Sequence, residues 1–175
     1  MTVATGLAGR ADQLRSDFDH SFAVARRPDG TARHDLIAIR VGVEPFAVRL
    51  AEVSGLFADR KITCVPGSHS ALLGIAGFRG AVVPIYSLNV LLNKSGTQAP
   101  RWLVIAAAAS VALAFDAFEG HLRAAADAIL KQQDSQSSSY APEFIRTGDL
   151  VRPVLNLRSV IEALGNAHIS RLTKE

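Results

Sequence analysis

The chain carries the same order of residues twice, and this internal repeat is the feature that most limits its fold. Residues 46–55 (FAVRLAEVSG) align with residues 111–120 (VALAFDAFEG), with apolar residues at matching positions and a glycine as the last residue of each. Residues 80–88 (GAVVPIYSL) resemble residues 148–157 (GDLVRPVLNL) in the same way, with one residue inserted before the second proline. Two stretches repeated in one order indicate two copies of a single structural unit.

Each copy contains short runs rich in Val, Ile and Phe that are separated by Gly and Pro, a pattern typical of β-strands. In the first copy such runs cover residues 35–42, 45–50, 61–66 and 80–88, whereas residues 50–57 also suit one or two helical turns. Pro84 lies inside the last run and indicates a strand edge or a bulge, because proline has no N–H for a ladder. We therefore expect a mainly β fold of two small β-barrels in tandem.

A brief helix is expected at the end of each copy. The segment LNVLL follows Ser87 and the segment LRSVIEAL follows Asn156. We predict that both residues are helix caps, since a serine or asparagine side chain accepts from the free N–H groups of the first turn. Residues 106–110 (AAAAS) favour helix by propensity and contain no Gly, Asn or Pro for a turn. We give the repeat more weight than this propensity and predict strands joined by a turn there.

Composition agrees with a globular protein that has its own core. Hydrophobic residues make up 49% of the 175, and 19 Lys and Arg are scattered among 16 Asp and Glu. The single cysteine, Cys64, cannot form an internal disulfide, and we expect it to be a small buried residue in a reducing compartment. The N-terminus has no secretory signal, and the apolar run at residues 102–115 is too short to cross a membrane. The sequence thus predicts a cytoplasmic protein without direct membrane insertion.

Enzymatic and metal sites find little support in the residue spacing. Ser68, His69 and Ser70 are adjacent, but neighbours on an extended segment point apart and do not form a nucleophile and base. The five histidines are too far apart for a local metal site, and GIAGFRG lacks the lysine and helix of a phosphate-binding loop. We expect no catalysis and no cofactor. A β-barrel that binds single-stranded nucleic acid is an alternative, but aromatic residues are only 6% and the phenylalanines lie mostly at repeat-matched apolar positions.

Four segments together resemble the CheW family of chemotaxis coupling proteins. They are residues 34–56, 64–92, 111–122 and 148–164, and the most specific piece is the small apolar stretch that leads into Arg79, Gly80, an apolar strand and Pro84. The resemblance implies two intertwined five-stranded β-barrels with a few short helices and a hydrophobic seam between the barrels. It also implies a non-catalytic adaptor that bridges chemoreceptor cytoplasmic tips to the regulatory domain of the histidine kinase CheA.

The resemblance also implies the domain limits. A CheW-like domain would cover residues 35–165, with the first repeat at about 35–94 and the second at about 101–165, followed by a C-terminal tail at 166–175. Residues 1–34 form an extension in which Leu14, Phe18 and Phe22 have helical spacing, so an amphipathic helix is expected there. That helix would pack on the protein's own barrel or dock a partner.

Four residues are implied as receptor contacts: Arg79 and Gly80 in the motif, and Val53 and Leu56 after the second strand. The chain departs from the family at Gly77, where the family usually has Asn, and this departure removes an amide beside the implied receptor site. Ser87 and Asn156 stand where the family commonly has Asp and preserve helix capping. The alternative function is a divergent scaffold that competes for receptor or kinase sites without activating the kinase.

Overall fold

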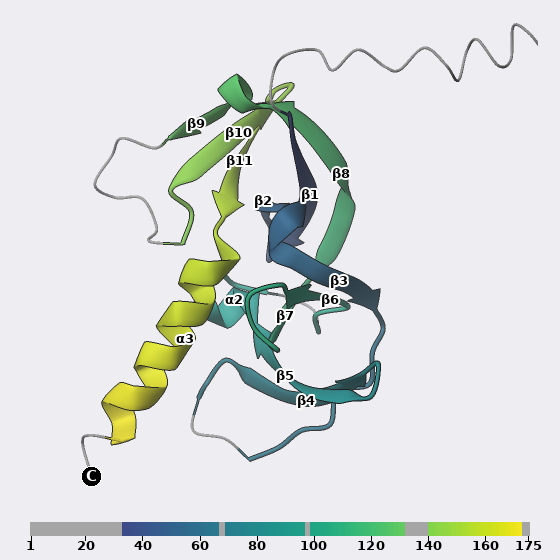
Figure 1. Cartoon of the computed structure of the whole chain (residues 1–175), viewed down its shortest axis with the longest axis vertical. Coiled ribbons are helices and arrows are strands. Elements are labelled where there is room, and N and C mark those ends of the chain that lie inside the picture. The colour runs from purple at the N-terminus through teal and green to yellow at the C-terminus, as the bar shows by residue number, and fades with distance from the viewer. Residues whose placement is uncertain (1–32, 67–68, 97–98, 132–139, 173–175) are drawn as a thin grey trace, which may run out of the picture. The chain divides into compact units, whose positions relative to one another are not determined.

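The computed structural model of the chain describes residues 33–66, 69–96, 99–131 and 140–172, with side chains up to Gly165 (Figure 1). The predicted N-terminal helix lies outside these residues. The described chain is mainly β, as predicted. Its strands are β1 (Arg33–Val41), β2 (Glu44–Arg49), β3 (Val53–Ala58), β4 (Leu72–Phe78), β5 (Ala81–Ser87), β6 (Trp102–Ala106), β7 (Ala112–Phe115), β8 (Ala117–Ala125), β9 (Ile129–Lys131), β10 (Glu143–Thr147) and β11 (Leu150–Leu155). Its helical segments are η1 (Leu50–Glu52), α2 (Leu88–Leu91), η2 (Ala126–Ala128) and α3 (Leu157–Leu172).

The described strands form two sheets, and each sheet takes strands from both repeats. The large sheet has the order β8-β1-β2-β11-β10-β9, and the small sheet has the order β3-β6-β7-β5-β4. The pairing is the same in both: an antiparallel hairpin (β1–β2 or β6–β7), then a parallel neighbour (β11 or β5), then an antiparallel one (β10 or β4). The first two strands of each repeat lie in one sheet, and all later strands of that repeat lie in the other sheet. This exchange confirms the intertwined arrangement, but the large sheet has six strands where five were expected, because β9 adds to its edge.

Both sheets curl until their edges meet. In the small sheet, β3 and β4 are opposite edges, yet the rings of Phe57 and Phe78 lie with centroids 4.8 Å apart. The chain after β3 also bridges to β4, where Thr63 and Ile75 exchange backbone hydrogen bonds of 2.8 and 2.9 Å. In the large sheet, the edge strands β8 and β9 are joined through η2 alone. Each sheet is therefore a small barrel, with the Thr63 bridge in the place that β9 has in the other barrel.

The core has three parts. The largest is the seam between the sheets, where large side chains of both sheets pack with α2 and α3; it includes Ile37, Ile39, Phe46, Val48, Leu88, Leu113, Phe115, Leu155, Val160 and Leu164. The other two fill the barrels and contain many small residues, such as Ala112 and Ala114 in the small barrel and Ala47 and Ala124 in the large one. Central strands are thus buried on both faces, which explains why β7 reads as a continuous apolar run (ALAF) rather than an alternating one.

Residues 106–110, the alanine-rich segment, are not helical, which agrees with the prediction made from the repeat. Residues 107–110 form a turn between β6 and β7, which we call the alanine turn. The Ala106 N–H donates to the Val111 carbonyl at 3.0 Å. The Ala107 N–H donates to the Glu52 carbonyl at 2.8 Å, which ties this turn to η1. Ladder pairing and these turn bonds therefore outweigh the helix propensity of alanine.

Several expectations from the sequence need correction. Residues 61–66 form only the single Thr63 bridge and not a strand, and Cys64 is consequently exposed rather than buried. Pro84 is not in an edge strand: β5 is internal, but its parallel pairing with β7 begins only at Ile85, so no β7 partner needs an N–H from Pro84. The last helix does not end at Leu164 but continues to Leu172, into the segment expected to be a tail.

Candidate functional site

Arg79 and Gly80 form the tip of the β4–β5 hairpin. The last pair of the ladder is Phe78 with Ala81, which leaves a two-residue loop. Both loop residues have positive φ, +48° for Arg79 and +85° for Gly80, as a type I′ turn requires. Glycine adopts this conformation freely, but for an arginine it costs about 1 kcal/mol. Strained non-glycine residues gather at functional sites, and Arg79 is exposed here.

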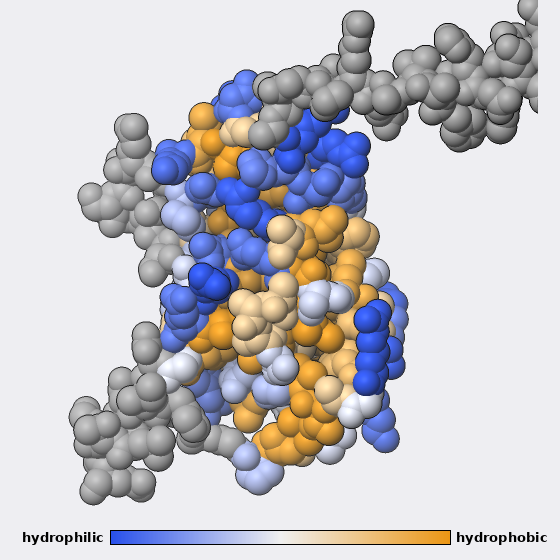
Figure 2. Space-filling view, viewed as in Figure 1, coloured by the Kyte–Doolittle hydropathy of each residue, from blue (hydrophilic) through white to orange (hydrophobic). Residues whose placement is uncertain are grey.

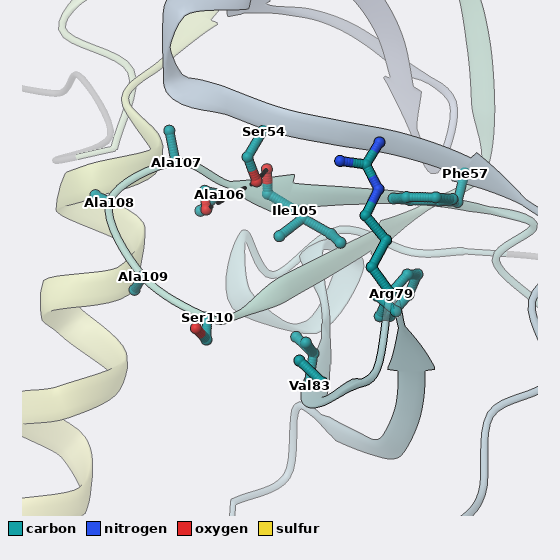
Figure 3. Close-up of a pocket in the computed structure, with 12 residues that line it drawn as sticks. Ser54, Phe57, Arg79, Val83, Ile105, Ala106, Ala107, Ala108, Ala109 and Ser110 are labelled. Carbon is teal, nitrogen blue, oxygen red and sulfur yellow. Dashed lines mark hydrogen bonds between the residues drawn. The ribbon is translucent and has the colours of Figure 1, made fainter.

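A pocket of about 460 Å³ lies beside this hairpin. We call it the Arg79 pocket. It is lined by Ser54 and Phe57 of β3, by Phe78, Arg79, Ala81 and Val83 of the hairpin, by residues 105–106 of β6, and by residues 107–110 of the alanine turn. Figure 3 shows the Arg79 side chain extending from its turn along the pocket, with the guanidinium between Ser54 and Phe57 in this view. The small side chains of the alanine turn leave this space open.

The Arg79 pocket has one charged lining residue and no lining carboxylate. Within the described part of the chain, Arg79 makes no hydrogen bond or ion pair. Figure 2 shows apolar residues gathered over the region of β4 and β5, with hydrophilic residues near the end of β3. The pocket therefore combines apolar and polar surface with one available guanidinium, which suits an acidic group on an amphipathic partner.

Val53 and Leu56 lie in β3, as the first and fourth residues of that strand. Both are half-buried and pack against the seam, and neither lines the Arg79 pocket. Their packing role is therefore clear from the structure. Their contact with a receptor stays a prediction.

Ser87 and Asn156 stand at the N-termini of α2 and α3. Ser87 Oγ accepts from the Val90 N–H at 3.4 Å, and Asn156 Oδ1 accepts from the Ser159 N–H at 3.0 Å. Sequence reasoning missed a third residue: Glu52 Oε2 accepts from the Leu157 N–H at 2.7 Å. Glu52 lines a second pocket of about 360 Å³ together with Arg158 and residues 106–108 of the alanine turn. No sequence signal could find this contact, because the two residues belong to different repeats.

The corresponding place in the large barrel is closed by an ionic cluster. The strand registers match Ser54, Val83 and Ala107 of the Arg79 pocket with Glu119, Arg152 and Arg40. Glu119 stands at a β-bulge, where it accepts from Arg40 Nε at 2.8 Å and lies 2.6 Å from Arg152 Nη1. Arg152 is buried, and its contact with Glu119 is an ion pair rather than a well-aligned hydrogen bond. A carboxylate between two arginines thus fills the space that is open in the small barrel.

Other candidate groups from the sequence do not assemble into a reactive site. His69 Nδ1 accepts from the Ala71 N–H at 3.1 Å, and its ring meets Tyr86 edge-on. Ser68 lies outside the described residues. Among the residues described, no three His, Cys, Asp or Glu side chains come together as metal ligands. No described helix is both long and apolar enough to cross a membrane.

Comparison with known proteins decides the family. Residues 35–164 match the CheW-like domain. The chain belongs to the CheW-like domain family. Domains of this family are non-catalytic scaffolds. The chain is also 33% identical over 88 residues to the probable chemotaxis protein CheW of Rhizobium etli; the match covers 50% of this chain and 56% of that relative. The chain thus spans little more than half the length of this relative.

The fold has a counterpart among solved structures. The scaffolding protein TtCheW from Thermoanaerobacter tengcongensis superposes with a TM-score of 0.64, over 71% of this chain and 90% of that one, at 15% sequence identity. At this identity the likeness supports the fold alone. The two intertwined barrels and their seam are therefore the CheW-like architecture, as the resemblance in the sequence implied.

Proposed function

We propose that this chain is an adaptor that couples chemoreceptors to a CheA-type histidine kinase in a chemosensory complex. Membership in a family of non-catalytic scaffolds supports this proposal. One observation carries it: Arg79, which has no ion-pair partner among the described residues, is held by a strained turn at the edge of a pocket. Such a site suits docking of another protein through an acidic side chain. The cytoplasm, where receptor tips and kinases meet, is the proposed compartment.

The receptor surface in this proposal consists of Arg79 and Gly80, with Val53 and Leu56 on the neighbouring strand β3. Arg79 offers five N–H donors in a planar fork, which matches a carboxylate on a helical receptor tip. Gly80 has no side chain to crowd the guanidinium, and no atom lies within 4 Å of where its Cβ would be. Val53 and Leu56 would contribute through the part of each side chain that the seam leaves exposed.

An adaptor needs a second surface, and we place it on the outer end of the large barrel. Leu130 on β9 and Leu150 and Val151 on β11 are exposed by 49%, 40% and 44%. Leu130 lies opposite Phe144 and Val151 lies opposite Arg146, so their side chains share one face of the sheet. Exposed apolar side chains on one face are typical of protein–protein contacts. We assign this surface to the kinase regulatory domain because it belongs to a different barrel from the Arg79 pocket, so that both partners can bind at once.

Two reciprocal variants test this proposal. Arg79→Glu should weaken binding of a purified chemoreceptor tip at least about tenfold, because an attractive charge pair becomes a repulsive one. Its melting temperature and its affinity for the kinase regulatory domain should match those of the parent. Val151→Glu should do the opposite, with kinase binding weakened and receptor binding retained. Arg79→Lys should fall between parent and Arg79→Glu, since it keeps the charge but not the fork.

The outcomes separate the possible errors. If the parent binds neither receptor tips nor a CheA-type kinase, the adaptor proposal is wrong. If Arg79→Glu binds receptor tips as tightly as the parent does, the site is misassigned. Val53→Asp or Leu56→Asp reports on their contact only if the melting temperature stays near that of the parent, because both side chains also pack against the seam.

A divergent scaffold that competes without activating the kinase is the second candidate. The observation that favours it is Gly77, which is exposed and lacks the amide usual in the family. Kinase autophosphorylation in the presence of receptor distinguishes the two: an adaptor restores coupling to receptor, whereas a competitor lowers kinase activity as its concentration rises.

A further inference from the structure

A second arginine lies next to the Arg79 pocket, and nothing in the sequence pattern marks it. Arg60 Cζ lies 5.1 Å from the centroid of the Phe57 ring and 5.7 Å from that of the Phe78 ring. Both rings line the Arg79 pocket. Arg60 therefore covers the point where the two edges of the small barrel meet, at the margin of the pocket that contains Arg79.

The turn after β3 sets the position of Arg60. Asp59 has a φ of +52°, a left-handed conformation that aspartate tolerates better than most residues. The Asp59 N–H donates to the Arg101 carbonyl at 2.9 Å, and both carboxylate oxygens of Asp59 accept from the Arg101 guanidinium at 2.7 Å. These contacts fix the turn that directs Arg60 back over the rings of β3 and β4.

Arg60 is left without an acidic partner by the same contacts. Its neighbour Asp59 is occupied on both oxygens by Arg101. Within the described residues, neither Arg60 nor Arg79 has a hydrogen bond or an ion pair. A guanidinium that packs on aromatic rings can still donate from the N–H groups at its edge. Two guanidinium groups beside one pocket therefore have N–H donors that no described residue uses.

In the large barrel two arginines bind an acid at the corresponding place, although by register they match Ala107 and Val83 rather than Arg60 and Arg79. At the matching place, Arg40 and Arg152 hold the carboxylate of Glu119. The small barrel has Ser54 where the large barrel has Glu119, so its own chain supplies no acid there. Charge complementarity thus favours a carboxylate from outside the chain.

We propose that Arg60 is a second determinant of specificity, and that Arg60 and Arg79 together hold the carboxylates of one acidic helical segment docked at the Arg79 pocket. This inference rests on the proposed function, because the receptor tip is taken as the source of that segment. Arg79 would bind the segment at the hairpin, and Arg60 would bind it where β3 ends.

Binding of a purified chemoreceptor tip fragment, measured by calorimetry at low and at physiological salt, tests the role of Arg60. Arg60→Met keeps an apolar stem over Phe57 and Phe78 but loses the charge. It should bind about fivefold or more weakly, with a smaller salt dependence, and melt near the parent temperature. Lys61→Met is the matched control, because it makes the same charge change at the next residue, and it should bind like the parent. Arg60→Lys should recover part of the affinity.

Each possible result supports or contradicts either the role of Arg60 or the proposed function. Parent-like affinity of Arg60→Met at both salt concentrations overturns the role of Arg60 and leaves the Arg79 assignment standing. An equal loss in Lys61→Met reduces the effect to general charge and overturns it as well. If Arg60→Met fails to fold, Arg60→Lys decides: a weakening of about twofold to fivefold supports the proposal, and parent-like binding contradicts it. Failure of the parent itself to bind any receptor tip contradicts the proposed function instead.

Discussion

Glu119 is the acidic residue of the ionic cluster in the large barrel. A β-bulge directs its side chain, which is only 22% exposed, between Arg40 and the buried Arg152. Partial burial alone would raise the pKa of Glu119, but its interactions with Arg152 and Arg40 outweigh burial and hold the pKa below the usual 4.5. A carboxyl with a lowered pKa stabilises the fold above its unfolded pKa, and this stabilisation disappears as the pH falls through the lowered value.

Glu119→Gln should therefore cost about 2 kcal/mol at pH 7, because it leaves Arg152 buried beside a neutral group. As the pH falls from 5 towards 3, the parent should lose stability and converge on the variant, since Glu119 then becomes protonated. Urea unfolding of both proteins across this range measures the difference. A difference that stays constant down to pH 3 would show that Glu119 does not act through its charge. Comparison with the variant removes the effects of Asp35 and Asp59, whose pKa values are also lowered by their arginine partners.

For a single residue, the sequence predicts the position correctly only where the residues adjacent in the chain determine it. Gly80 beside Arg79 was sufficient to predict a tight turn with an exposed arginine, because the turn is local. Arg60 and Glu52 were missed, since their positions depend on residues brought together by the fold: the rings of Phe57 and Phe78 for Arg60, and the first N–H of α3 for Glu52. The burial of Cys64 was predicted wrongly because its segment was taken for a strand.

At the scale of elements, closure of the small barrel depends on the contact between β4 and the segment that contains Thr63. Gly74 lies in β4 with a φ of +142°, and a Cβ there would stand 2.2 Å from the Thr63 carbonyl oxygen. Both the backbone conformation and the clash exclude a side chain. The bridge between Thr63 and Ile75 therefore requires a glycine at position 74.

Gly74→Ala should lower the free energy of unfolding by at least about 2 kcal/mol, through backbone strain and displacement of the Thr63 bridge. Gly77→Ala in the same strand is the control, because no atom lies within 4 Å of its Cβ position, and it should change stability by less than about 1 kcal/mol. Denaturant unfolding measures both. Equal effects of the two substitutions would mean that the bridge contributes nothing to closure.

Strands that pair with a neighbour along most of their length could be predicted from the sequence, whereas a segment that pairs at one residue could not. β1, β2 and β5 were recognisable from their apolar runs and turn residues, because they pair along most of their length. Residues 61–66 have the same composition but pair at one residue only, so composition could not distinguish them from a strand. The last helix was expected only over residues 157–164, yet α3 continues to Leu172.

For the whole molecule, the question is whether the described region folds by itself. Every residue of the three core clusters lies between Leu36 and Leu164. The chain divides into one unit before Arg33 and a second unit from Arg33 onward. A protein that begins at Arg33 should therefore be folded and melt within a few degrees of the full chain, as measured by circular dichroism.

An insoluble truncation would contradict this expectation and show that Leu14, Phe18 and Phe22 cover the barrel, at about 1.5 to 3 kcal/mol for each side chain that is fully buried. A folded truncation that no longer binds receptor tips would assign the N-terminal segment to partner docking. Both proteins need the same receptor assay, so that loss of fold and loss of contact are measured separately.

The exchange of strands between the two barrels has a mechanical consequence. The backbone passes from the large sheet to the small one after β2 and returns after β7, so the barrels share two covalent crossings as well as the seam. A force on the Arg79 hairpin is therefore transmitted to the large barrel through the backbone itself, and these connections limit sliding of one barrel against the other. In the proposed function, a movement of the receptor would therefore reach the kinase as a tilt of the whole described domain rather than as a rearrangement within it.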